Sequence, residues 1–348
     1  MMPITRLLLT HFTAFKQLDM KLSPGINVLI GANGTGKTHI MKFAYAACAI
    51  SAPKSMTNFA RKLVRVYLPS ERALGRLVRR GQRNVEGSAE IHRDDLTLRI
   101  SFSRNATTPG SATVTGEKEW RSRPIESVYI PVEEMLANAP GFPSLYAKRE
   151  IHFEEIYADI LDRAYLPRLR DKEERIEPLL KKLQQLIGGQ VTKKGDEFFI
   201  RYKQGELEFT LLAEGLRKLG LLWLLMQNGT LAHGSVLFWD EPETNLNPKL
   251  FGPVIEILLE LQRIGVQIFL ATHDYVILKE IDLRMTKNDN ILFHSLYRDE
   301  STGEIMCHSV SDYLAIHPNV ILETFTNLYD RTIKRVLEEK TYCESSGG

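Results

Sequence analysis

Residues 26–50 read "INVLIGANGTGKTHIMKFAYAACAI" and decide the fold of this chain. They begin with a short apolar run that predicts a buried strand, and they end in a segment whose apolar residues recur at helical spacing. The turn between the two, residues 31–38, fits the pattern G-x-x-x-x-G-K-[ST]. A strand, this turn and a helix in that order predict a phosphate-binding loop.

The residue types in this turn suit phosphate chemistry. Glycines adopt positive φ and let backbone N–H groups close around phosphate oxygens, while the helix N-terminus adds partial positive charge. Lys37 is expected to reach the β and γ phosphates of a nucleotide, and the Thr38 hydroxyl is expected to ligate Mg²⁺. We therefore predict that the nucleotide contacts are Gly31, Ala32, Asn33, Gly34, Thr35, Gly36, Lys37, Thr38 and His39.

A second strand ends on two adjacent acids. Residues 236–248 read "VLFWDEPETNLNP", in which an apolar run is followed by Asp240 and Glu241. Carboxylates this close repel each other and resist burial unless they face a cation, and successive strand side chains point to opposite faces. We predict that Asp240 holds Mg²⁺ beside Thr38, and that Glu241 is the general base for the water attacking the γ-phosphate. The alternative is that both acids merely end a strand in a turn.

A third strand, within "VQIFLATHDY" at 266–275, ends on Thr272, His273 and Asp274. In a parallel sheet this end and the end of the acidic strand lie at the same edge, where ligands bind. We therefore predict that His273 contacts the γ-phosphate. The alternative is a packed or capping histidine.

These motifs together carry a family resemblance. "GANGTGKT", "VLFWDEPETNLNP" and "ATHD" resemble the Walker A, Walker B with D-loop, and switch-histidine motifs of ABC-type ATPases. The chain is most similar to the RecF/SMC/OLD branch, including AAA-type ATP-binding proteins of prokaryotic anti-phage systems of the Septu type. Three further stretches are similar to that branch as well. They are residues 4–31, which resemble its first hairpin, "SVYIPVEEML" at 127–136 and "LLAEGLRKLGLLWLL" at 211–225. The resemblance covers most of the chain.

The resemblance implies a fold and a reaction. The fold is an α/β P-loop NTPase, an ABC-ATPase head with a mixed central sheet, an antiparallel β subdomain and an inserted helical lobe. The reaction is hydrolysis of ATP with Mg²⁺. The implied catalytic residues are Glu241, His273 and Lys37, and the implied metal ligands are Thr38 and Asp240.

A signature helix is also implied. In such ATPases its N-terminus faces the γ-phosphate bound by the other subunit, and the matching residues here are Ala213, Glu214 and Gly215, with Asn245 in the D-loop. Ala213 departs from the family, which usually has a serine there. Loss of one hydroxyl hydrogen bond to a charged group costs roughly 1.5 to 3 kcal/mol, although a helix N-terminus still offers free N–H groups. The alternative is that residues 213–226 form only an apolar core helix.

The expected domain organisation is a single ABC-type ATPase domain over 1–348. Residues 51–125 are expected to form an inserted lobe with a basic helix and a β-hairpin. Residues 145–210 are expected to form a helical lobe and a hairpin that lead to the signature helix. Residues 230–348 are expected to hold the Walker B motif, the switch histidine and a C-terminal helix.

The stretch at 56–81 is predicted to be a helix broken at Pro69, and it is strongly basic. Its basic residues, together with Arg83 just after it, are Arg61, Lys62, Arg65, Arg72, Arg76, Arg79 and Arg80. Such a patch could contact the phosphates of double-stranded DNA or another nucleic acid. It could equally be a solvated helix face or a dock for an acidic partner.

Composition narrows the class of protein. The chain has 348 residues, 43% hydrophobic and 25% charged, and a formal charge of +2, which is too small to imply a polyanion partner for the whole protein. Cys48, Cys307 and Cys343 show no metal-binding spacing, so a reducing, cytoplasmic setting is expected. The longest apolar run, 219–226, is far shorter than the ~20 residues of a membrane span, and the N-terminus does not resemble a signal peptide. We expect no membrane association.

Three functions are open at this point. The first is an ATPase whose nucleotide-dependent homodimer, or higher homo-oligomer, controls a separate effector such as a nuclease or toxin, in anti-phage defence or DNA maintenance. The second is an ATP-loaded scaffold that turns over slowly and restrains an effector. The third is a transporter motor. The acids outside the nucleotide site form no recognisable metal cluster, so any nuclease activity is expected from another chain, and no glutamine stands in a clear Q-loop context.

Overall fold

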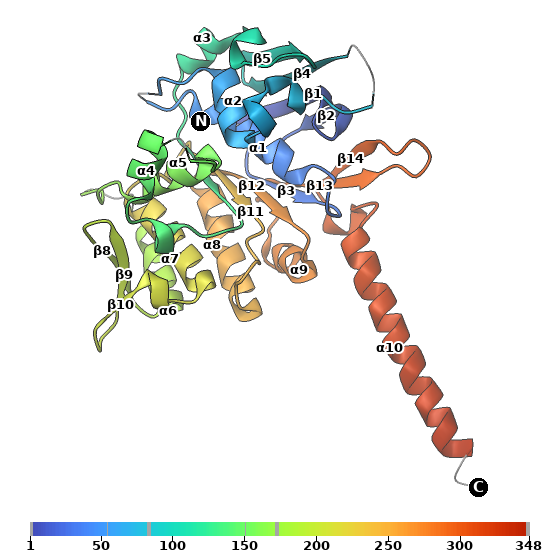
Figure 1. The fold of residues 1–348 in the computed structure, drawn as a ribbon. Helices are drawn as coiled ribbons and strands as arrows, with labels where there is room; N and C mark the ends of the chain where they lie inside the picture. Colours follow the sequence, from blue (N-terminus) through green and yellow to red (C-terminus); the bar gives the residue numbers. More distant parts are fainter. Residues whose placement is uncertain (1–2, 54, 82–84, 150, 171–173, 346–348) are drawn as a thin grey trace.

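The structure is a computed structural model, and it describes residues 3–53, 55–81, 85–149, 151–170 and 174–345. Within these residues, β-sheets and surrounding helices form one body, and the last helix extends away from it (Figure 1). The α/β fold predicted from the sequence is confirmed.

The central sheet has the strand order β14-β13-β3-β12-β11-β7. Its strands are β3 (Ile26–Ile30), β7 (Ser127–Ile130), β11 (Val236–Asp240), β12 (Gln267–Thr272), β13 (Ile291–Arg298) and β14 (Ile305–Val310). Neighbouring strands run parallel except β13 and β14, which pair antiparallel, so the sheet is mixed as predicted. The almost uniformly apolar strands β3 and β11 are typical of parallel strands that are buried on both faces.

An antiparallel sheet packs above the central one, with the order β2-β1-β4-β5-β6 (Figure 1). Its strands are β1 (Ile4–Phe12), β2 (Phe15–Lys21), β4 (Glu86–Arg93), β5 (Leu96–Ser103) and β6 (Thr113–Thr115). Strands β4 and β5 are the β-hairpin that was expected within residues 51–125. Because β4 pairs with β1, this hairpin continues the sheet that the N-terminal strands begin. A small third sheet consists of β8 (Gln190–Lys194), β9 (Glu197–Arg201) and β10 (Glu206–Glu208).

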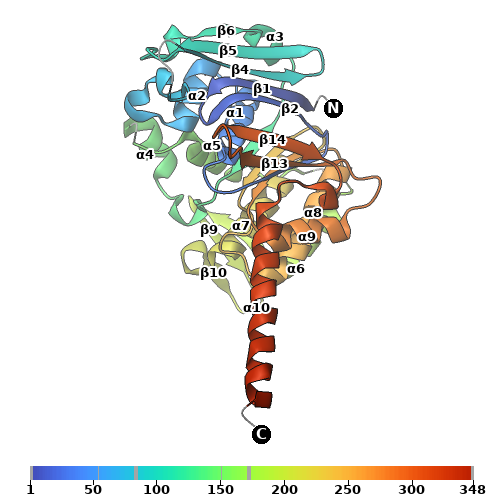
Figure 2. The same cartoon turned by 90° about the vertical axis from the view of Figure 1, so that its right-hand side faces the viewer.

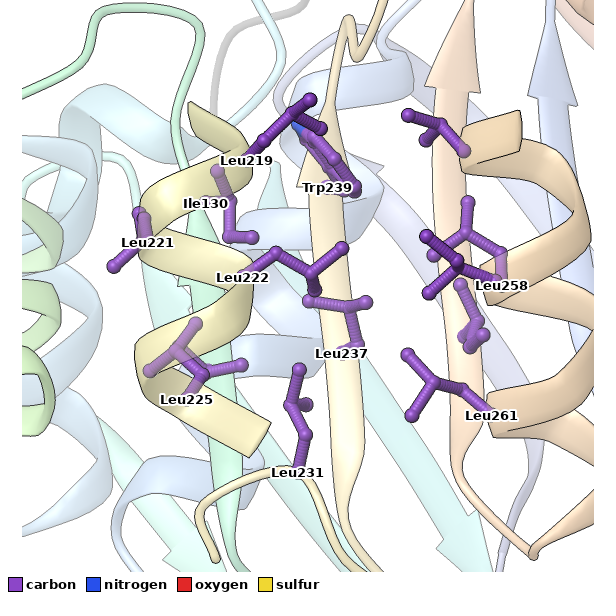
Figure 3. Packing of buried hydrophobic residues seen from close by; sticks show 14 of the residues in the cluster. Ile130, Leu219, Leu221, Leu222, Leu225, Leu231, Leu237, Trp239, Leu258 and Leu261 are labelled. Atoms are coloured by element: carbon purple, nitrogen blue, oxygen red, sulfur yellow. The ribbon is translucent and has the colours of Figure 1, made fainter. Parts of the chain in front are cut away.

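Alternate residues of β11 belong to different hydrophobic cores. Phe238 packs in the core that lies between the central sheet, helix α1 (Lys37–Ala49) and the antiparallel sheet. Leu237 and Trp239 pack on the opposite face, against α7 (Glu214–Gln227) and α8 (Phe251–Arg263) (Figure 3). By the same alternation, the side chain of Asp240 follows Phe238 toward the α1 side.

The remaining helices lie around these layers. They are α2 (Phe59–Tyr67), α3 (Glu117–Arg121), α4 (Phe142–Arg149), α5 (Glu155–Ala164), α6 (Glu177–Ile187), α9 (Tyr275–Arg284) and α10 (Val320–Ser345). No helix in the described segments combines the length and the apolar composition that a bilayer crossing needs.

The sequence-based prediction of a helix on both sides of Pro69 is wrong. Helix α2 ends at Tyr67, and residues 70–77 form two short 3₁₀ turns instead. Proline stops the first helix, and a tight contact keeps the second from forming: Gly75 N–H donates to the Ala106 carbonyl at 2.7 Å. Strand β8 was also missed, whereas the hairpin of β9 and β10 was predicted.

Candidate active site

Three strand ends meet at one edge of the central sheet. Strand β12 lies between β3 and β11, with Thr272 paired to Ile30 and Ala271 paired to Asp240. The glycine-rich turn, the two acids and His273 therefore leave the sheet side by side, although about 210 residues of sequence separate the turn from the acids. This juxtaposition is the basis of the candidate site.

Lys37 is held against its own loop. Its side chain is buried, and Nζ donates to the carbonyls of Gly31 at 2.6 Å and Ala32 at 3.1 Å. Burial lowers the pKa of Lys37, while the nearby carboxylates of Glu241 and Asp240 act in the opposite direction. A polyanion entering the loop would restore the favourable environment that a buried ammonium lacks.

The loop backbone is shaped to admit an anion. Gly31 has φ 149°, and a Cβ there would lie 2.2 Å from the Leu296 carbonyl oxygen. Gly34 has φ 78° and opens on space without neighbours within 4 Å, so its backbone is free for close approach. Helix α1 begins after Gly36, which supplies no side-chain cap, so the first N–H groups of the helix are available to phosphate oxygens.

Asp240 is a buried carboxylate next to two hydroxyl groups. The Tyr129 hydroxyl donates to its Oδ2 at 2.9 Å, and the Thr38 hydroxyl also favours its charged form. Burial raises the pKa of Asp240, and the two hydroxyls partly offset this increase. A hard cation between Asp240 and Thr38 would favour the charged carboxylate, so these residues fit Mg²⁺. Among the described residues no three His, Cys, Asp or Glu side chains are grouped to bind a metal, so such an ion would take its other ligands from phosphate and water.

Glu241 has an unusual backbone. Its φ is 47°, in the left-handed region, and its N–H donates to the Ala271 carbonyl at 2.9 Å. A non-glycine residue held this way costs roughly 1 to 3 kcal/mol, and such strain clusters at functional sites. The carboxylate accepts from the Thr244 hydroxyl at 3.2 Å and lies 3.3 Å from His273 Nδ1. The two residues predicted to be catalytic from separate motifs are thus direct neighbours.

Glu243 was not predicted as a site residue. Its Oε1 accepts from the Thr272 hydroxyl at 2.7 Å and from the His273 N–H at 3.1 Å, and it lies 3.9 Å from His273 Nδ1. Burial raises the pKa of Glu243, and these donors favour its charged form. The side chain therefore ties the loop after β11 to the end of β12 and positions His273. The only signal in the sequence is a third acid shortly after the pair.

Tyr129 was likewise missed. It lies on the edge strand β7, where its ring stacks on Phe238 and meets Tyr45 edge to face at 5.6 Å. The Tyr45 hydroxyl donates to a different carboxylate, that of Asp159, at 2.6 Å. Each of these two buried tyrosines thus donates to one carboxylate. Of the two, Tyr129 donates to Asp240 and Tyr45 donates to Asp159.

The signature segment lies against the loop after the acids. Ala213 is the N-cap of α7 and makes no side-chain cap, as an alanine must. A Cβ at Gly215 would lie 2.5 Å from the Asn245 carbonyl, so this glycine permits close packing on the D-loop. The buried Lys218 donates to the Thr244 carbonyl at 3.0 Å. Among the described residues no hydrogen bond or ion pair joins Ala213 to the phosphate loop, and its predicted contact with nucleotide stays a prediction.

His39 lies on the first turn of α1. Its backbone carbonyl accepts from the Tyr67 hydroxyl, and its ring is 5.8 Å from the Tyr67 ring. Burial lowers the pKa of the His39 imidazole, which keeps it neutral beside the loop.

The basic stretch is only partly available to a partner. Lys62 pairs with Asp159 at 2.5 Å, Arg65 with Glu155 at 3.3 Å, and Arg79 with Glu304 at 2.7 Å. Arg61, Arg76 and Arg80 are exposed, and Arg83 lies outside the described residues. Intramolecular pairing therefore reduces the positive charge that the sequence predicted for this face.

Comparison with known families gives one match over most of the chain. Residues 26–279 match the family model described as "AAA domain, putative AbiEii toxin, Type IV TA system". The chain is also similar to proteins named DNA replication and repair protein RecF. It is 38% identical to that of Paenarthrobacter aurescens over 47% of this chain and 37% of the relative, and 40% identical to that of Pseudarthrobacter chlorophenolicus over 24% and 20%. The chain thus spans well under half the length of the relatives it matches.

Solved structures support the fold. An Smc head domain from Pyrococcus furiosus, with an extended coiled coil and bound to the C-terminal domain of ScpA, aligns with a TM-score of 0.52 at 13% identity, covering 95% of this chain and 100% of that one. A second Smc head, bound to the C-winged helix domain of ScpA, aligns with a TM-score of 0.55 at 13% identity, covering 90% of this chain and 100% of that one. At such identities the likeness concerns the fold alone.

Proposed function

This chain belongs to that AAA-domain family, and from this premise we propose that it is an ABC-type ATPase of the RecF/SMC branch that binds and hydrolyses ATP with Mg²⁺. The observation that carries the proposal is the meeting of Lys37, Asp240 and His273 at one sheet edge. In this proposal the hydrolytic unit is a single domain over 1–348, in which residues 51–125 are an inserted lobe and residues 145–210 are a helical lobe and hairpin that lead to the signature helix.

Each residue has a stated role in the proposal. Residues 31–39 bind the phosphates with backbone N–H groups, and Lys37 exchanges its two loop carbonyls for phosphate oxygens. Thr38 and Asp240 hold the metal, which supplies charge neutralisation on the phosphate oxygens. Glu241 accepts the proton of the attacking water.

His273 completes this arrangement. Its ring is exposed and lies 3.3 Å from Glu241, so it can hydrogen bond to the γ-phosphate while remaining in contact with the base. Glu243 holds the His273 backbone in place. The strained backbone of Glu241 would then hold the base in position for catalysis.

We test the base with Glu241→Gln. The amide keeps the shape of the side chain but cannot take a proton, so ATP should bind as in the wild type while turnover falls at least about 100-fold. Glu197→Gln, an exposed glutamate on β9, is the matched control and should leave both quantities unchanged. Wild-type turnover in the Glu241 variant would reject this residue as the base.

The biological role in this proposal is control of a separate effector. The ATP-binding site of one copy would be completed by residues of a second copy, namely Ala213, Glu214, Gly215 and Asn245. The resulting homodimer would act on a nuclease or toxin in anti-phage defence or DNA maintenance. The RecF name of the relatives supports the DNA connection, and the Smc heads bound to ScpA support a protein partner.

A slow ATP-loaded scaffold is the second candidate, and Ala213 favours it because the serine hydroxyl of the signature is missing. Steady-state turnover distinguishes the two readings. A rate well below one ATP per minute, with nucleotide retained through gel filtration, would favour the scaffold. Co-purification with a membrane permease would instead point to the transporter reading.

A further inference from the structure

Helix α10 projects from the body along most of its length. Figures 1 and 2, which are 90° apart, both show it as a single projecting helix. The beginning of the helix is anchored: Ile321 is buried, and the Phe325 ring stacks on Tyr275 of α9 at 4.6 Å. Every side chain from 322 to 338 is exposed within the described chain.

The exposed part of α10 carries an apolar stripe. Its members recur every three or four residues, which places them on one side of the helix. They are Leu322, Phe325, Leu328, Tyr329, Ile333 and Val336, with between 37% and 68% of each residue exposed. This spacing is the pattern of a helix face that packs against another element.

The helix needs such a contact for its own stability. It contains β-branched residues at positions 324, 326, 332, 333 and 336, and these lower helix propensity. Most helical stability in proteins comes from packing of an amphipathic face. The described contact of α10 with the body lies near its beginning, where Phe325 stacks on Tyr275 of α9.

We propose that α10 pairs with α10 of a second copy of this chain through the apolar stripe. The six side chains together expose roughly 500 Å² per chain, taking about 150 to 250 Å² for a fully exposed large side chain. Two copies would then bury about 1,000 Å², the size at which a specific interface becomes plausible. A two-fold contact between identical faces is also the commonest form of oligomer.

The charges on α10 favour a copy of itself over a charged partner. Between 322 and 338 there are three acids (Glu323, Asp330, Glu338) and three bases (Arg331, Lys334, Arg335). The exposed helix is therefore neutral, so two copies do not repel each other, and nucleic acid gains no net attraction. This pairing needs no nucleotide, and it is separate from the ATP-dependent contact of the heads proposed above.

The test uses the full-length protein in EDTA without nucleotide, studied by sedimentation from about 1 to 50 µM. The wild type should be dimeric in this range. The double variant Tyr329→Glu with Ile333→Glu places two charges in the stripe and should be monomeric, with dimerisation weakened at least 100-fold. Thr324→Glu with Asn327→Glu adds the same charge on the opposite side of the helix and should remain dimeric.

Several results would overturn the pairing. They are a monomeric wild type at 50 µM, a stripe variant as dimeric as the wild type, or equal losses in both double variants. The thermal transition of the body, which all three proteins should share, shows that the variants are folded. A dimer that forms only with Mg²⁺ and ATP would support the contact of the heads while rejecting the pairing of α10.

Discussion

Removal of the Tyr129 hydroxyl tests how the structure supports the metal carboxylate. In Tyr129→Phe, Asp240 loses its 2.9 Å donor, while the ring keeps its stacking on Phe238. A hydrogen bond to a charged group is worth about 1.5 to 3 kcal/mol, which corresponds to a factor of about 10 to 150. Loss of a partner that orients a metal ligand typically weakens metal binding by about 10- to 100-fold. We therefore expect Mg²⁺ binding to weaken by at least about tenfold.

The matched control is Tyr45→Phe. Tyr45 is equally buried and also donates to a carboxylate, but its partner is Asp159 rather than Asp240. Both variants lose one buried hydroxyl, so both should lose a similar amount of folding stability, and only Tyr129→Phe should change the metal requirement.

The assay is calorimetric titration of the protein with ATP at a series of Mg²⁺ concentrations, and again in EDTA. Electron paramagnetic resonance of bound Mn²⁺ gives a reading of the metal that is independent of turnover. ATP binding in EDTA should be the same for the wild type and both variants. A Mg²⁺ dependence within twofold of the wild type in Tyr129→Phe, or an equal loss in Tyr45→Phe, would refute the reasoning.

Three further predictions concern other parts of the chain. Glu243→Ala should lower kcat about tenfold with little change in the KM for ATP, because the His273 N–H loses its acceptor; an increase in KM alone in steady-state kinetics would contradict this. Burial lowers the pKa of His294 from its ordinary 6.5 to about 4. Between these two pH values the unfolded chain binds a proton that the folded chain does not. Lowering the pH should therefore reduce the free energy of unfolding by up to about 3 kcal/mol. Urea unfolding at pH 7.5 and pH 5 should show about 2 kcal/mol of this loss, and His294→Gln should reduce it; equal losses in both proteins would assign the acid sensitivity to other groups. Arg76→Glu with Arg80→Glu should weaken salt-sensitive duplex binding in a gel-shift titration, and an absence of binding by the wild type at low salt would remove nucleic acid from the proposal.

The sequence predicted the parts of the site that local pattern determines. The phosphate loop between a strand and a helix is one such pattern, and the pair of acids at the end of an apolar strand is another. Each of them is contained in a short stretch of sequence. Glu243 and Tyr129 gave no such signal, because their roles depend on strand order. Glu243 reaches the end of β12 only because β12 lies beside β11, and Tyr129 reaches Asp240 only because β7 lies on the other side.

The errors have the same origin. Lys62 was counted as part of a positive face, but the fold places Asp159 of α5 next to it. The second half of the predicted helix at 56–81 was replaced by 3₁₀ turns because Gly75 packs on the backbone near Ala106. Both outcomes depend on residues distant in sequence, which a local pattern does not contain.

The strand order also links nucleotide binding to completion of folding. The phosphate loop follows β3 near the N-terminus, whereas the acids follow β11, and β12 must insert between the two strands before the halves of the site meet. A nascent or truncated chain that stops short of β12 would therefore hold the loop without its carboxylates in place. At an ATP concentration a thousand times its Kd, ATP would raise the free energy of unfolding of the complete sheet by about 4.1 kcal/mol. A chain that lacks β12 would not gain this stabilisation. Bound nucleotide would then stabilise only those chains whose central sheet is fully assembled.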